Sequence, residues 1–166
     1  VLEDDTSESL TVRMFERGAE LLARTLPAWD SGELAAKPQD DSMATYSRRL
    51  EKSNGALDFS RPAKQLSNQI RALHSWPGAF TRWNGRNLKV LKALPLSVDV
   101  ADSGELAGAT PGRVVAVHSQ GAASLGIVTG DGLLGIVELQ LEGRKASESD
   151  AFLRGHPVFL GAQLPN

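Results

Sequence analysis

The 166-residue sequence contains no cysteine, and aromatic residues make up only 5% of it. Without cysteine it has no disulfide framework, no thiolate nucleophile and no thiolate metal ligand. Its three histidines, at positions 74, 118 and 156, do not show the spacing of a metal site. No run approaches the roughly eighteen apolar residues of a membrane span. These absences exclude disulfide-stapled and membrane-spanning classes, and the lack of cysteine is typical of a reducing cytoplasm.

Catalytic motifs are missing as well, with no G-x-G-x-x-G, P-loop or G-x-S-x-G in the chain. The TGDG run at 129–132 lies between two apolar segments and has no helix after it, so it predicts a hairpin turn rather than a phosphate-binding loop. His74 has Asp58 and Ser60 upstream, but at no recognisable catalytic spacing. We interpret it as a partly buried loop histidine, and the sequence predicts neither catalytic nor metal-binding residues.

The net charge of −2 hides a strong segregation of charge along the chain. Residues 1–47 carry four Lys/Arg against ten Asp/Glu, and residues 93–166 carry four against eight. Residues 48–92 carry ten Lys/Arg against only two Asp/Glu. A basic block this concentrated is typical of a surface that faces a polyanion or an acidic neighbour. The alternative is a solvated helix face together with strand edges that Lys and Arg protect from pairing.

The first thirty residues have a helical pattern. Thr6 or Ser7 can cap the helix, and Gly18 predicts a joint between two helical pieces. Apolar residues recur at helical spacing, at Leu10, Met14, Leu21, Leu22 and Leu26. Residues 31–57 are polar, contain Pro and Gly and show no sustained period, so they predict a linker.

From residue 58 onward the pattern predicts a small β-domain. Ser60 is the expected cap of a helix whose apolar stripe is Ala63, Leu66, Ile70 and Leu73. After Pro77-Gly78 the period changes to two, with a hairpin expected at Asn84-Gly85. Ser147 and Asp150 form the pattern of a capping box for a short last helix. Strands are expected at 79–83, 87–94, 113–118, 124–129 and 133–141, which predicts a mainly β fold, a closed or nearly closed barrel with flanking helices.

Residues 72–86, ALHSWPGAFTRWNGR, hold two of the three tryptophans. Trp76, Phe80 and Trp83 are candidates for stacking on nucleic-acid bases. Phe80 is an even number of residues from Trp76 and an odd number from Trp83, so the three cannot all line one face of a strand. We therefore interpret at least one of them as part of the core.

In order and spacing, these segments resemble the C-terminal part of the methionyl-tRNA formyltransferase family. The chain departs from the family's usual pattern at Leu73-His74-Ser75, where Phe-Asn-Pro is usual, and at Phe59, where Trp is usual. It also has Tyr46-Ser47-Arg48-Arg49 where Tyr-Ala-x-Lys is usual, which retains a cation at Arg49. The matching segments are DTSESL (5–10), AELLARTLPAW (19–29), PQDDSMATYSRRL (38–50), GALDFSRPA (55–63), IRALHSWPGAFT (70–81), LKVLKA (88–93), TPGRVV (110–115), IVTGDGLLGIVELQLEGRK (127–145) and FLRG (152–155).

The resemblance implies a fragment of a cytoplasmic two-domain enzyme of translation initiation, which transfers a formyl group from 10-formyltetrahydrofolate to initiator methionyl-tRNA. Residues 1–30 would be the last helices of the Rossmann-like catalytic domain, 31–57 the linker, and 58–166 an OB-like barrel that helps to hold the tRNA. The catalytic residues and the folate site would then belong to the preceding domain, so no cofactor and no activity are expected of this piece. Its expected partners are the tRNA and its own N-terminal domain. Because the apolar stripe of residues 1–30 lacks its partner sheet, we expect it to pack on the barrel or on a second copy, and we expect self-association or a disordered N-terminus.

On this interpretation the basic residues hold the tRNA backbone. Lys64 and Arg71 would join the others into one track if their helix docks on the same side of the barrel. Two alternatives remain: the C-terminal domain of a folate-dependent formyltransferase or hydrolase that acts on an amino-sugar nucleotide, and a stand-alone OB-type RNA-binding module. The candidate tRNA-backbone residues are Arg48, Arg49, Lys52, Lys64, Arg71, Arg86, Lys89, Arg144 and Lys145.

Overall fold

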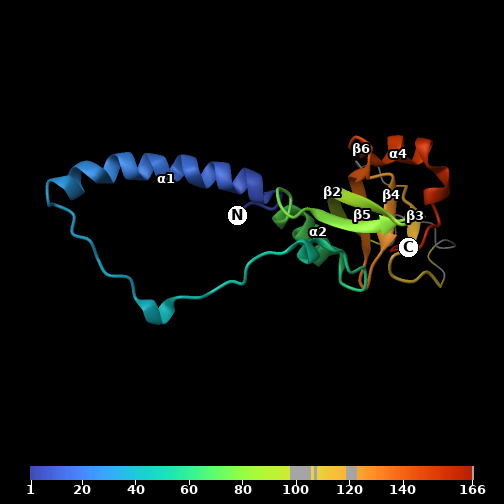
Figure 1. Cartoon of the computed structure of the whole chain (residues 1–166), viewed down its shortest axis with the longest axis horizontal. Helices are drawn as coiled ribbons and strands as arrows, with labels where there is room; N and C mark the ends of the chain where they lie inside the picture. The colour runs from blue at the N-terminus through green and yellow to red at the C-terminus, as the bar shows by residue number, and fades with distance from the viewer. Residues whose placement is uncertain (98–105, 107, 119–122, 166) are drawn as a thin grey trace. The chain divides into compact units, whose positions relative to one another are not determined.

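The computed structural model describes residues 1–97, 106, 108–118 and 123–165. The chain divides into two compact units, Val1–Leu50 and Glu51–Asn166. Figure 1 labels their helices and strands. Among the described helices, none combines the length and the apolar character that a membrane span requires.

The first unit is built on one long helix, α1 (Ser7–Asp30). Thr6 caps it, because its side-chain oxygen accepts from the Ser9 amide at 3.1 Å while the Ser9 hydroxyl accepts from the Thr6 amide at 3.0 Å. The predicted joint at Gly18 is wrong, since the helix continues through that residue. A glycine inside a helix costs only about 1 kcal/mol relative to alanine and does not forbid the helical conformation. No residue of α1 is buried, and its apolar stripe is exposed at Met14, Leu21, Leu22 and Leu26.

The segment after α1 is polar and exposed as far as Leu50, with one short turn of 3₁₀-helix, η1 (Asp41–Met43). A second turn, η2 (Lys52–Gly55), already belongs to the second unit. Gly55 and Leu57 are buried there, and the Leu57 amide donates to the Phe80 carbonyl at 2.9 Å. The compact unit therefore begins at Glu51, ahead of the boundary that the sequence places at residue 58.

The second unit is an antiparallel sheet that curls around a helix, α2 (Ala63–Ala72). The strand order is β1-β2-β5-β4-β3, and β6 pairs with the far end of β5. The expected hairpin is confirmed, with Asn84 and Gly85 both at positive φ, as a two-residue primed turn requires. A seven-residue helix, α4 (Ser149–Gly155), and a 3₁₀ turn, η4 (Pro157–Phe159), complete the unit. The strands are β1 (Ala79–Trp83), β2 (Arg86–Leu96), β3 (Val114–Ala116), β4 (Leu125–Val128), β5 (Leu133–Leu141) and β6 (Ser147–Glu148).

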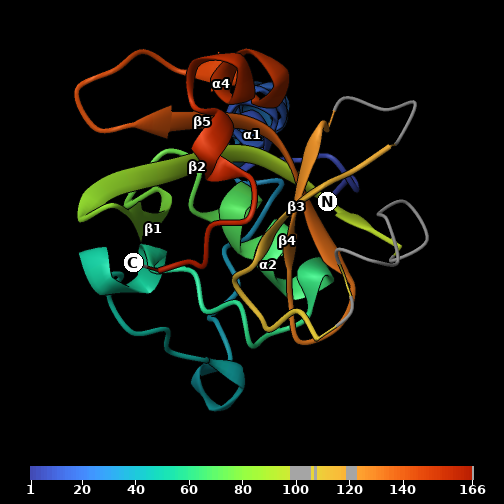
Figure 2. The same cartoon turned by 90° about the vertical axis from the view of Figure 1, so that its right-hand side faces the viewer.

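The sheet is a half-barrel rather than a closed one. Among the described residues no ladder joins its two outer strands, β1 and β3. Each outer strand is paired instead by irregular chain: Ala56 bridges to Phe80 of β1, and the Val114 amide of β3 donates to the Ala162 carbonyl. Figure 2 shows the strands curving around the inner side of the sheet, with α4 lying against β5. These coverings satisfy the backbone groups that an open sheet edge would leave free.

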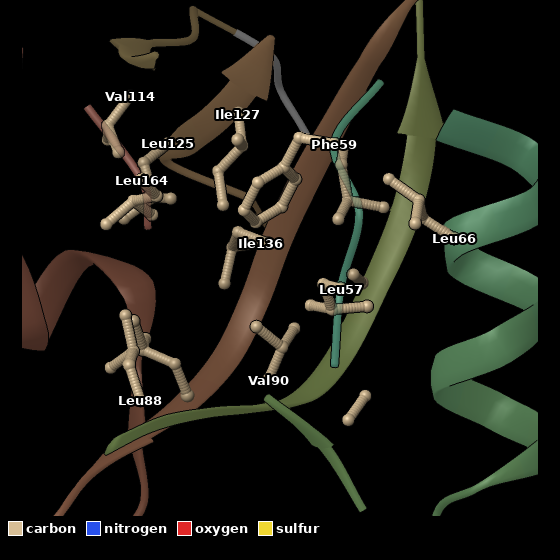
Figure 3. Close-up of a cluster of buried hydrophobic side chains, with 14 of the residues drawn as sticks. Leu57, Phe59, Leu66, Leu88, Val90, Val114, Leu125, Ile127, Ile136 and Leu164 are labelled. Carbon is tan, nitrogen blue, oxygen red and sulfur yellow. The ribbon is translucent and has the colours of Figure 1, made fainter. Parts of the chain in front are cut away.

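The core occupies the inner side of the curl. Figure 3 shows Leu66 of α2 together with Leu57 and Phe59, facing Val90 of β2 and Ile136 of β5. All five side chains are buried. Burying apolar surface at about 25 cal/mol per Å² is the main favourable contribution to such a fold. Because α2 contributes to this core, it packs on the concave side of the sheet.

Two predicted helix caps are wrong. The N-cap of α2 is Pro62, and the Ala63 amide is satisfied by the Asp131 carbonyl at 2.9 Å, not by Ser60. Ser60 instead donates to Asp58, which lowers the pKa of that carboxyl group. The predicted capping box of Ser147 fails because Ser147 lies in β6, opposite Leu139. In both cases a tertiary contact replaced the local one that the sequence pattern predicted.

A pair of threonines tests how buried hydroxyl groups affect the stability of this unit. Thr81 and Thr129 are both buried, and among the described residues Thr81 Oγ1 is a buried oxygen with no hydrogen-bond partner. Thr129 Oγ1 lies 2.8 Å from the Asp131 carbonyl and 2.7 Å from the Gly132 carbonyl. Thr129→Val is expected to lower the free energy of unfolding by about 1–2 kcal/mol, and Thr81→Val to leave it unchanged or raise it by up to about 1 kcal/mol. Urea denaturation measures both, and an equal loss in the two variants would contradict the prediction.

Candidate nucleic-acid interface

Exposed cations gather on the outward face of the β1–β2 hairpin. Inward positions of β1 and β2 are buried, so the alternate residues point away from the core. The strand register then places Arg82 opposite Asn87, and Lys89 opposite Phe80. On its other side Lys89 lies opposite Gln140 of β5. Arg82 and Lys89 are therefore on one face, and both side chains are exposed.

Two turns lie together at one end of this face. Arg86 is the first residue of β2, directly after the turn of the β1–β2 hairpin, and its guanidinium donates to the Glu142 carbonyl in the turn that connects β5 to β6. The Asn87 amide donates to the Glu142 carboxylate at 3.0 Å, and the Glu142 amide donates back to the Asn87 carbonyl at 2.9 Å. The β5–β6 turn is fixed in addition by Gln140, whose side-chain amide donates to the Arg144 carbonyl at 2.9 Å. The two turns are thus held together by hydrogen bonds, with Arg86 beside one of them, Arg144 and Lys145 in the other, and Lys89 opposite Gln140 of the neighbouring strand.

The opposite end of the same face is acidic. Lys92 of β2 lies opposite Glu138 of β5, which in turn lies opposite Glu148 of β6. These carboxylates would repel a phosphate chain at that end. A polyanion on this face is therefore directed toward the two turns. Arg86 is paired with the buried Trp83, so it belongs to the other side of the hairpin, at the edge beside the β5–β6 turn. We use the name hairpin face for the exposed cations Arg82 and Lys89 together with this edge residue, Arg86.

The remaining candidate residues lie elsewhere. Lys52 is in η2, which contacts β1. Lys64 and Arg71 are on α2, which packs on the concave side of the sheet. The helix therefore does not dock on the same side as the outward cations, and the expected continuous track of basic residues is not formed through it. Arg48 and Arg49 are exposed in the first unit, which is considered separately from the sheet.

Sequence reasoning omitted Arg82, although it had a signal that could have found it. Once Asn84-Gly85 is accepted as a two-residue turn, the register pairs Arg82 with Asn87, which is two residues from Lys89. Residues two apart on a strand share a face, so Arg82 and Lys89 had to lie together. The strand pattern alone could not show that the β5–β6 turn would lie beside the first hairpin.

The aromatic residues divide between core and surface. Trp83 is buried, with ring centroids 4.9 Å from Phe159 and 5.9 Å from Phe152, which confirms the prediction that at least one aromatic of the 72–86 run belongs to the core. Trp76 is 52% exposed. His74 is exposed too, which corrects its interpretation as a partly buried loop residue.

The titratable groups of the described residues can be compared with what a metal site or a general acid requires. Among them, no group of three or more His, Asp or Glu side chains is placed to hold a metal ion. Among the described carboxyl groups, every perturbed pKa is lowered. The cause is local hydrogen bonding, as for Asp150 beside Arg154. Such groups remain ionised and cannot act as general acids near neutral pH. The arrangement of cations therefore points to an anion-binding surface.

Comparison with known proteins gives a consistent result. A family model described as "Formyl transferase, C-terminal domain" matches residues 49–157. The chain is similar to a protein named methionyl-tRNA formyltransferase from Pelobacter propionicus, with 43% identity over 98% of this chain and 47% of the relative. It is also similar to a protein of the same name from Trichlorobacter lovleyi, with 38% identity over 99% of this chain and 48% of the relative. The chain thus spans about half the length of the curated relatives it matches.

Solved structures share the fold at low sequence identity. A crystal structure of a HypX variant from Aquifex aeolicus superposes with a TM-score of 0.63 and 19% identity, covering 92% of this chain and 26% of that one. A second HypX structure, titled as a complex with tetrahydrofolic acid, gives a TM-score of 0.58 and 20% identity, covering 81% of this chain and 22% of that one. At such identities the likeness describes the fold alone.

Proposed function

The chain belongs to the family of formyl transferase C-terminal domains, and from this premise we propose that it is the tRNA-holding half of a methionyl-tRNA formyltransferase. The observation that carries the proposal is the extent of the match: relatives of that name align with 98–99% of this chain at 38–43% identity. The reaction would be formyl transfer from 10-formyltetrahydrofolate to initiator methionyl-tRNA in the cytoplasm. Its catalytic residues and folate site would lie in the part of the enzyme to which this half is joined.

The described surface supports a role in holding RNA. Phosphate contacts from Arg and Lys fix the position of a nucleic acid without reading its sequence. The hairpin face and the neighbouring β5–β6 turn offer such cations on paired strands and hydrogen-bonded turns. Lys64 and Arg71, on the other side of the sheet, are then secondary candidates. Selection of the initiator tRNA would depend on the catalytic half.

An amino-sugar nucleotide acceptor would need no extended basic surface, since it carries only a short diphosphate. The two acceptors are therefore distinguished by tRNA affinity. Binding of fluorescently labelled initiator and elongator tRNA to the chain, followed by anisotropy, tests the proposal. We expect weak and nearly equal affinity for both tRNAs, which falls steeply as salt is raised. Failure to bind either tRNA at low salt would overturn the proposal.

The exposed pair Arg48 and Arg49 provides a further prediction. If both contact phosphates, the double change to glutamine should lower the affinity for every tRNA and reduce the slope of log affinity against log salt by about two. The matched control is the double change of Arg17 and Arg24 to glutamine, because these arginines are exposed in the same unit and the charge change is equal. Identical binding curves for the two double variants would show that Arg48 and Arg49 do not contact the RNA.

A further inference from the structure

A cavity opens between the β5–β6 turn and α4, next to the cations of that turn. Its volume is about 420 Å³, within the roughly 300–1,000 Å³ that ligand pockets occupy. Leu141 and Phe152 line its floor but are only 1% and 4% exposed, so the half-buried His156 offers the accessible ring. Arg144, Lys145, Ala146 and Ala151 also line the cavity. The cavity therefore has apolar walls and cations at the turn.

The aromatic wall of the cavity is held in place from behind. The ring of His156 has its centroid 4.7 Å from that of Phe152 and 5.4 Å from that of Trp83. Its backbone is fixed on both sides, because the His156 amide donates to Leu153 at 3.2 Å and its carbonyl accepts from Phe159 at 2.9 Å. A wall that does not have to be ordered on binding loses less entropy when a ligand arrives.

The charges around the cavity favour an anion. Among the described residues that line it, the charged side chains are Arg144 and Lys145, and both are exposed. The nearby carboxylate of Asp150 is already paired with Arg154 at 2.7 Å. The Glu142 carboxylate accepts from the Asn87 amide, on the other side of the turn. A ligand with one planar apolar part and one phosphate matches this distribution.

We propose that this cavity binds a single nucleotide, with its base against the ring of His156 and its phosphate on Arg144 and Lys145. The nucleotide is an unpaired residue of the bound RNA, in which case the inference rests on the proposed function, or a free mononucleotide. Stacking of a base on an aromatic ring is tolerant of base identity, so little preference among the four bases is expected. When the nucleotide is part of the RNA, Arg144 and Lys145 contact the phosphate of this unpaired residue, and the hairpin face contacts the rest of the backbone.

Filling the cavity tests the inference. Ala151 is exposed on α4 and lines the cavity, so Ala151→Leu removes space without changing charge. Ala72→Leu is the matched control, because Ala72 is exposed at the end of α2 and is not part of the lining. Ala146→Leu, at an exposed lining position in the turn, is the second filling variant in case the first does not fold. Binding of AMP, GMP, CMP and UMP is followed by amide chemical shifts in the whole 166-residue chain, and tRNA binding by anisotropy.

We expect both filling variants to weaken mononucleotide binding by about tenfold or more relative to Ala72→Leu, from the strength of base stacking. A similar loss of tRNA affinity with an unchanged salt slope identifies the nucleotide as part of the RNA. A loss confined to mononucleotides identifies it as free nucleotide. Equal binding by the filling variants and the control would overturn the inference while leaving the proposed function intact. Nucleotide binding without any tRNA binding would overturn the proposed function instead.

Discussion

Replacing Gly130 by alanine is expected to unfold the second unit under conditions in which the natural chain is folded. A Cβ atom at this position would lie 1.8 Å from the Ser60 carbonyl oxygen, far inside contact distance. The turn cannot move away easily, since the Gly130 amide donates to Phe59 at 2.9 Å and to Arg61 at 3.2 Å. Shifting it would also break the bond from the Ala63 amide to Asp131, which satisfies the first turn of α2. We expect a loss of more than about 3 kcal/mol in the free energy of unfolding.

The control for this change is Gly155→Ala. Gly155 ends α4, and a Cβ atom added there would meet nothing within 4 Å. Its free energy of unfolding should stay within about 0.5 kcal/mol of the natural value, as for most surface changes. Urea denaturation of the two variants measures the difference. If Gly130→Ala were as stable as Gly155→Ala, the close contact between the 129–132 turn and Ser60 would not exist in solution.

Neutralising the hairpin face is expected to lower tRNA affinity on the order of a hundredfold near 0.1 M salt. The variant changes Arg82, Arg86 and Lys89 together to glutamine. Each cation that pairs with a phosphate contributes about one power of salt concentration to the affinity, so removing three such cations has a large effect at about 0.1 M salt. All three side chains are exposed, and the bond from the Glu142 amide to the Asn87 carbonyl still joins the two turns when the Arg86 guanidinium is removed, so the fold should tolerate the change. Anisotropy with labelled tRNA at fixed salt gives the ratio of affinities.

A second triple variant controls for net charge. Arg61, Arg113 and Arg154 are also exposed in the second unit, but they lie at the start of α2, before β3 and on α4. Their change to glutamine removes the same three charges from other surfaces. We expect it to weaken tRNA binding less than about tenfold, through the long-range field alone. If the two triple variants bound equally, the attraction would be general and the hairpin face would have no special role.

The sequence predicted the strands well because their side chains are sorted by burial. Strands β1 and β5 have the predicted bounds, since alternation and the Asn84-Gly85 turn fix them locally. Helix capping was predicted less well, because the amide of Ala63 is bonded by the distant Asp131. A pattern confined to neighbouring residues cannot show such a contact.

The candidate site was predicted in part. Arg86 and Lys89 are far in the sequence from Arg144 and Lys145, and the bond from Arg86 to Glu142 joins the two chain segments that carry them. Lys64 and Arg71 have the same charge but are on α2, whose side of the sheet is set by the burial of Leu66. Helix docking depends on the whole core, so it could not be inferred from the charge pattern.

The most direct measurement is the slope of log affinity for tRNA against log salt concentration, compared between the natural chain and the Arg82, Arg86 and Lys89 triple variant. Phosphate contacts release counterions at roughly 0.7–0.9 per contact. We therefore predict a steep slope for the natural chain and a slope smaller by between about two and three for the hairpin-face variant, with the control triple variant close to the natural chain. A flat salt response of the natural chain, or the same slope in both triple variants, would contradict the assignment of the hairpin face as the surface that holds the tRNA backbone.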